Sequence, residues 1–185
     1  MTIDELLTEH RNYYVNQFTE FQNSFPDGAT ELLLELQTEE PEELYRLYRY
    51  DLIQRENGED KISEFNVDGF LNHQEIVFTI GNKSLVVNPL VWNGVEISCN
   101  NTSVDFKPIV EWAHRWIDES EQTSERLAEK IHNITKPSIE SDWLTTSVDF
   151  GTAPVKAMIE LLEILLSDEL TTSVRIESKW MTQEN

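Results

Sequence analysis

The sequence predicts an α+β fold, with one mixed, largely antiparallel sheet, an N-terminal helical layer and further helices packed on the sheet. Three observations support this fold class. Apolar residues recur at helical spacing over roughly the first sixty residues and again from residue 105, whereas they alternate between residues 74 and 99. No internal repeat or linker separates these segments, so we expect residues 1–185 to form a single domain.

Residues 1–58 are expected to form the helical layer. Thr2 and Glu5 have the spacing of a capping box, and a helix is expected to follow them. A second helix is expected from about Thr30, and Pro41 would break it. The third helix then ends at Asn57-Gly58.

Residues 74–99 are expected to form an antiparallel meander of three strands. Gly81 and Asn82 provide the first turn, and Asn93-Gly94 is a strong hairpin signal for the second. Pro89 lies in the middle strand, which therefore would be an edge strand or carry a bulge.

Residues 105–134 are expected to contain two helices. The first places Trp112 and Trp116 on its core side, and a weaker one covers about Glu125 to His132. Residues 143–178 are predicted to form a strand, a helix and a strand. A crossover helix of this kind joins parallel strands of one sheet.

Charge is the main functional signal. The chain has 35 acidic and 14 basic residues, a net charge of −21. Such a surface repels nucleic acid and anionic membranes and attracts basic proteins. Intracellular antidotes of bacterial nuclease toxins (immunity proteins) and inhibitors that mimic nucleic acid bind basic partners in this way. By analogy of charge and size, we expect a non-enzymatic protein that masks a basic partner.

The predicted partner surface is a run of acidic residues in the N-terminal third. Like charges four residues apart destabilise a helix, so such a ridge would be costly without a role. A solvated face that only keeps the protein soluble is the alternative explanation. The residues are Glu31, Glu35, Glu39, Glu40, Glu42 and Glu43.

A small carboxylate- or metal-dependent hydrolase or nuclease is the alternative function, with Asp149, Glu111, His114 and Asp118 as candidate residues. Glu111 with His114, and Glu129 with His132, have the Glu-x-x-His spacing of di-iron bundles. However, the first pair and Asp118 point away from the apolar side of their expected helix, so no metal site or cofactor is expected.

Asp149 follows a predicted strand and precedes a helix that Thr152 could cap, which is where α/β sheets place ligands. The alternative is that Gly151 and Thr152 only turn the chain. Cys99 and His10 are interpreted as core residues.

The cellular location is expected to be cytoplasmic. The N-terminus lacks a secretory signal, and no run approaches the roughly 18 apolar residues of a membrane helix. A single cysteine excludes an internal disulfide and suits a reducing compartment.

Overall fold

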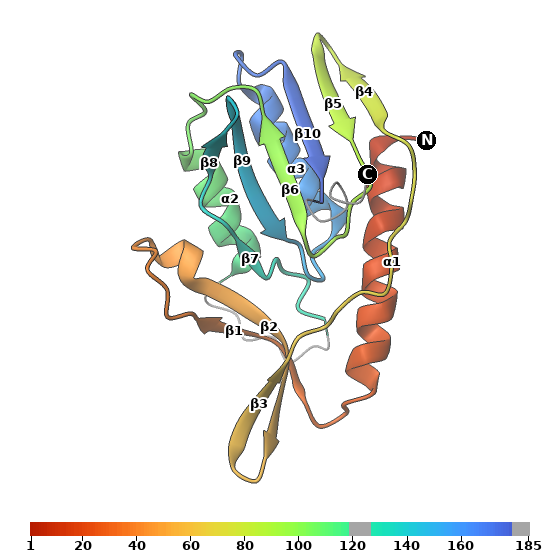
Figure 1. Ribbon diagram of the computed structural model, residues 1–185, viewed down its shortest axis with the longest axis vertical. Helices are drawn as coiled ribbons and strands as arrows, with labels where there is room; N and C mark the ends of the chain where they lie inside the picture. Colours follow the sequence, from red (N-terminus) through yellow and green to blue (C-terminus); the bar gives the residue numbers. More distant parts are fainter. Residues whose placement is uncertain (119–126, 179–185) are drawn as a thin grey trace.

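A seven-stranded mixed sheet lies at the centre of the computed structural model, which describes residues 1–118 and 127–178 (Figure 1). The strand order is β4-β5-β10-β6-β9-β7, and β8 pairs with the beginning of β9. Among the described strands, only β5 and β10 pair in parallel, so the sheet is mixed and largely antiparallel, as predicted. Its strands are β4 (Ile76–Ile80), β5 (Lys83–Val87), β6 (Val95–Cys99), β7 (Asn133–Ile134), β8 (Ser138–Glu140), β9 (Trp143–Asp149) and β10 (Ser173–Glu177).

Three α-helices of the described chain accompany this sheet: α1 (Ile3–Asn23), α2 (Lys107–Ile117) and α3 (Val155–Ser167). α3 packs against both α1 and α2, and Figure 1 shows α2 and α3 behind the sheet. The capping box of Thr2 and Glu5 is formed, as predicted. Trp112 is buried in the core, whereas Trp116 is only partly buried and donates its indole N–H to Glu160.

The predicted strand, helix and strand of residues 143–178 are confirmed as β9, α3 and β10. Both strands pair antiparallel with β6, which lies between them, so they run parallel to each other. The buried residues of α3 recur at helical spacing and join the core, because one apolar stripe faces the sheet.

The predicted meander is only half correct. β4 and β5 form the expected hairpin, but β10 lies between β5 and β6, so Asn93-Gly94 does not close a second one. Instead, Trp92 is buried against Phe150, with 5.1 Å between the ring centroids. The side-chain hydroxyl of Ser178 accepts the N–H of Val91 and donates to the carbonyl of Gly94. Residues 91–94 therefore form a largely buried connection and not a hairpin turn.

The predicted helical layer over residues 1–58 is wrong beyond α1. A second, three-stranded antiparallel sheet follows, in the order β1 (Ala29–Glu35), β2 (Leu47–Glu56) and β3 (Glu59–Ser63). A short 3-10 helix, η1 (Glu43–Arg46), comes directly before β2. Asn57-Gly58 is the hairpin turn between β2 and β3, with both residues at positive φ. The described part of the chain thus contains two sheets, where the sequence predicts one.

The predicted second helix of residues 105–134 is also wrong where it can be seen. Residues 125 and 126 lie outside the described part of the chain, and residues 127–132 are not helical. Cys99 is buried in the core, as predicted. No helix within the described ranges is long and apolar enough to cross a membrane.

Candidate functional site

His132 is the centre of a buried group of charged side chains. Its side chain is 0% exposed, and its Nε2 lies 2.8 Å from Oε1 of Glu31. Its Nδ1 lies 3.3 Å from Oδ1 of Asp51 and 3.7 Å from Oδ2 of Asp149. The three carboxylates come from β1, β2 and β9, so the two sheets meet at this histidine.

Glu31 is fixed by three elements at once. In the register of β1 and β2, Thr30 pairs with Leu52 and Leu32 pairs with Tyr50, which places Glu31 level with Asp51. Its Oε1 accepts the hydroxyl of Thr152 at 2.6 Å, and its Oε2 accepts the N–H of Ala128 at 2.6 Å. Thr152 therefore binds Glu31 and does not cap α3, whose N-cap is Pro154. Because Glu31 and these partners are buried, Glu31 is part of the interior.

Gly151 explains how the histidine ring fits against β9. The residue has φ +46°, and a Cβ added there would lie 2.2 Å from Cδ2 of His132. Its N–H donates to Oδ1 of Asp149 at 2.8 Å, which orients that carboxylate at the end of β9. The backbone of His132 also donates to the carbonyl of Asp149 at 2.9 Å. Only glycine leaves room for the ring at this turn.

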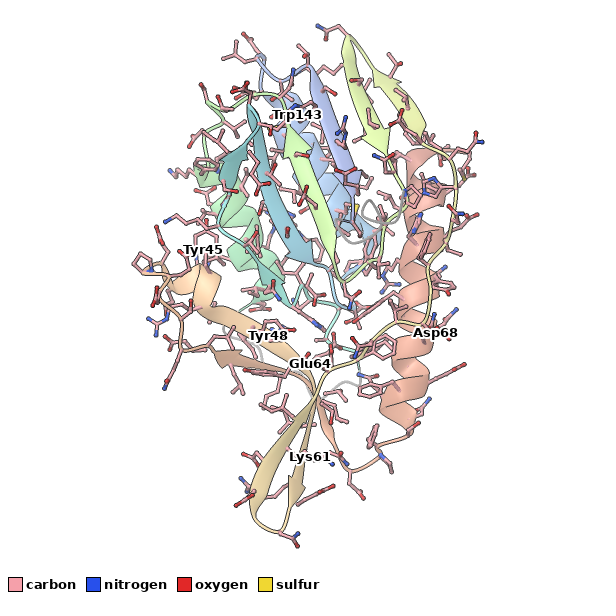
Figure 2. The ribbon with its side chains drawn as sticks, in the orientation of Figure 1. Tyr45, Tyr48, Lys61, Glu64, Asp68 and Trp143 are labelled. Atoms are coloured by element: carbon pink, nitrogen blue, oxygen red, sulfur yellow. The ribbon has the colours of Figure 1, made fainter. Side chains whose placement is uncertain are left out.

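An acidic pocket of about 330 Å³ opens on the outer side of this cluster. Asp51 and Asp149 form its inner end, and Glu64 lies at its outer end, where the phenol of Tyr48 donates to Oε2 at 3.3 Å (Figure 2). Lys, Arg and His are absent from the described residues that line it. The lining residues are Tyr48, Asp51, Glu64, Phe65, Asn66, Asn93, Gly94, Asn133, Ser147, Val148 and Asp149.

The pKa values of the pocket carboxyls are raised. Burial raises the pKa of Asp149 to about 7, opposed by the charge of His132 and reinforced by that of Asp51. Burial also raises the pKa of Glu64 to about 7, with a further contribution from its hydrogen bond to Asp51. Both carboxyls therefore change protonation near neutral pH.

His132 and Tyr14 respond to the same charges. Burial lowers the pKa of His132, but Asp149, Asp51 and Glu31 together raise it well above its usual value, which favours the charged form of the imidazole. The buried phenol of Tyr14 has no hydrogen-bond partner among the described residues, and burial followed by the charge of Asp149 raises its pKa. The cluster thus holds excess negative charge near an unpaired donor.

The other candidate catalytic residues do not join Asp149. Glu111 is exposed and lies 3.8 Å from Lys107, and Asp118 lies 3.1 Å from Lys130. His114 is exposed and lines a different pocket. Within the described residues, no group of three or more His, Cys, Asp or Glu side chains could hold a metal ion.

The predicted acidic ridge does not form, because its residues do not lie on one helix. Glu31 is buried, Glu35 forms an ion pair with Arg46, and the carboxylate of Glu42 lies 2.6 Å from Lys136. Glu39 is exposed, and Glu40, Glu42 and Glu43 line two further pockets.

Sequence reasoning missed Asp51, Glu64, Tyr48 and the central role of His132. One signal was present in β2, where Arg49 and Asp51 follow Leu47 at every second position. All three are buried, so alternation in this strand marks a buried face that carries two charges. The chain matches no protein-family model, no curated protein and no solved structure.

Proposed function

We propose that this chain binds a basic partner protein and that its acidic pocket receives a cationic side chain of that partner. The observation that carries the proposal is a pocket with three carboxyl groups, those of Asp51, Glu64 and Asp149, and no basic residue in its described lining. His132 faces Asp51 and Asp149 from the interior, so an incoming cation would pair chiefly with Glu64 and with the negative charge that His132 leaves uncompensated.

Arginine suits this pocket better than lysine. A guanidinium presents a planar set of N–H donors that pairs with carboxylates in a bidentate manner. The lining adds the side-chain oxygens of Asn66, Asn93, Asn133 and Ser147, which can accept the remaining donors.

The net charge of −21 supports the same proposal at long range. It would attract a basic protein before contact and speed association, and salt would weaken this steering. Masking of a basic toxin or nucleic-acid-binding protein, as by an intracellular immunity protein, is the class of function that such an arrangement serves.

The test uses acetyl-arginine amide and its neutral isostere acetyl-citrulline amide, titrated into the protein by NMR at pH 8. We expect the arginine compound to bind at least tenfold more tightly. Glu64→Gln should weaken that binding about tenfold, whereas Glu59→Gln, an equal change at an exposed position on β3, should not. Equal affinity for the two compounds, or equal loss in both variants, would refute the proposal.

Binding should also depend on pH. Because the pKa values of Glu64 and Asp149 are about 7, a cation must displace protons at pH 6 but meets carboxylates at pH 8. Affinity for the arginine compound should therefore rise between these values and level off above them. The rise should be smaller in Glu64→Gln, because one titrating group is lost.

An acid–base enzyme is a second candidate, favoured by one observation. Glu64, with a pKa of about 7 and a hydrogen bond from Tyr48, is placed at an open pocket as a general acid or base would be. Hydrolysis of bis(p-nitrophenyl) phosphate, with and without Mg²⁺, tests this alternative. Turnover that Glu64→Gln abolishes would favour the enzyme over the binding protein.

A further inference from the structure

The acidic pocket is one end of a longer groove. A second cavity of about 320 Å³ shares Tyr48 and Asn133 with it. A third cavity of about 390 Å³ shares Tyr45 and Lys136 with the second. The three cavities therefore adjoin one another, and Figure 2 shows Tyr45, Tyr48 and Glu64 in a row between the two sheets. We call these three cavities the groove.

The far end of the groove is apolar. Its lining includes Leu44, Tyr45, Phe106, Val110 and Pro137, contributed by η1, the start of α2 and the segment after β7. Phe106 is 39% exposed, so its ring can contact a ligand in this end of the groove. An aromatic or large aliphatic side chain would fill this end and exclude water from Phe106.

The charges along the groove select the occupant. Glu40, Glu42 and Glu43 line its apolar and middle parts. The basic side chains in the described lining are His114 and Lys136, and Lys136 pairs with Glu42 at 2.6 Å. A second copy of this chain, with its net charge of −21, or a nucleic acid would be repelled. A polypeptide segment with a basic residue for one end and a bulky apolar residue for the other is complementary to the groove.

We propose that the groove binds an extended segment of the basic partner, with an arginine in the acidic pocket and a bulky apolar side chain against Tyr45 and Phe106. This inference rests on the proposed function, which concerns the acidic pocket alone. Two linked contacts bind more tightly than either one when the linker matches their separation.

The experiment uses a series of peptides, acetyl-Arg-Gly(n)-Trp-amide with n from one to five, and acetyl-arginine amide as the reference. We expect one or two linker lengths to bind at least tenfold more tightly than the reference. Phe106→Ala should reduce that peptide to the affinity of the reference and leave the reference unchanged. Phe70→Ala removes another phenyl ring of similar exposure, 41%, outside the groove and should have no effect.

The outcomes separate the two proposals. If acetyl-arginine amide binds but no peptide in the series binds more tightly, the groove is refuted and the acidic pocket stands. Equal loss in Phe106→Ala and Phe70→Ala would also refute the groove, because the effect would not be local. If acetyl-arginine amide does not bind, both proposals fail.

Discussion

Gly151→Ala should destabilise the protein by an amount that reports the position of His132. An alanine at φ +46° costs about 1–2 kcal/mol of backbone strain, partly offset by about 0.4–1 kcal/mol from a less flexible unfolded chain. The new methyl group would also lie 2.2–2.8 Å from three atoms of the buried imidazole ring. Because the ring is held by Glu31 and backed by Asp51 and Asp149, relief of this overlap should cost about 1–3 kcal/mol more.

Gly81→Ala is the matched control. Gly81 has φ +62°, and a Cβ added there would meet nothing within 4 Å. It therefore measures the backbone term alone, which we expect to be about 1 kcal/mol, against about 3 kcal/mol for Gly151→Ala. Urea unfolding followed by tryptophan fluorescence gives both values at pH 7. Equal losses in the two variants would show that the histidine ring does not lie against this turn.

Three further predictions concern the buried charges and the core. Glu31→Gln should lower the free energy of unfolding by about 3 kcal/mol, because it leaves His132 without its closest carboxylate. A second variant, with Gln in place of Glu35, Glu39, Glu40 and Glu43, should change it by about 1 kcal/mol or less. Similar urea midpoints for the two variants would contradict this. Stability should fall as pH rises from about 5 to 8, because the folded-state pKa values of Asp149 and Glu64 are raised to about 7 and that of His132 is also raised, so the folded chain binds more protons. The pKa of His10 is lowered to about 4, so this residue acts in the opposite direction below pH 6.5. Asp149→Asn should reduce the loss of stability with rising pH. Urea midpoints that rise between pH 5 and 8 would refute the raised pKa values. Trp112→Ala should lower the free energy of unfolding by about 3–5 kcal/mol and Trp116→Ala by clearly less, since only Trp112 is fully buried. If thermal unfolding gave the reverse order, α2 would present its other face to the core.

The elements that the sequence predicts correctly are those whose signal is local. Thr2 and Glu5 form their capping box within one turn of helix, and α3 shows an apolar stripe that needs no knowledge of its partners. The β4–β5 hairpin closes through a short turn, so neighbouring residues carry the information. In each case, the residues that decide the structure lie close together in the chain.

The wrong predictions share a different property. In β2, leucine and tyrosine residues suggested a helical face, but Arg49 and Asp51 are buried by partners from β1, the end of α2 and the segment after β3. A hydrophobic-period argument treats these charged residues as exposed, and therefore it misassigns the strand. The hairpin signal at Asn93-Gly94 failed because β10, about eighty residues later, occupies the place beside β6.

By itself, the sequence determined the fold class, the excess of acid and the position of Asp149 at the end of a strand. Only the tertiary structure decided that Asp149 meets Asp51 and Glu64 in one pocket, and that Glu31 turns inward to His132. The physical reason is that a carboxylate becomes a buried ligand or an exposed charge according to the partners around it. Those partners come from β1, β2, β9, the residue after β3 and the residue before β7, and no local pattern records their meeting.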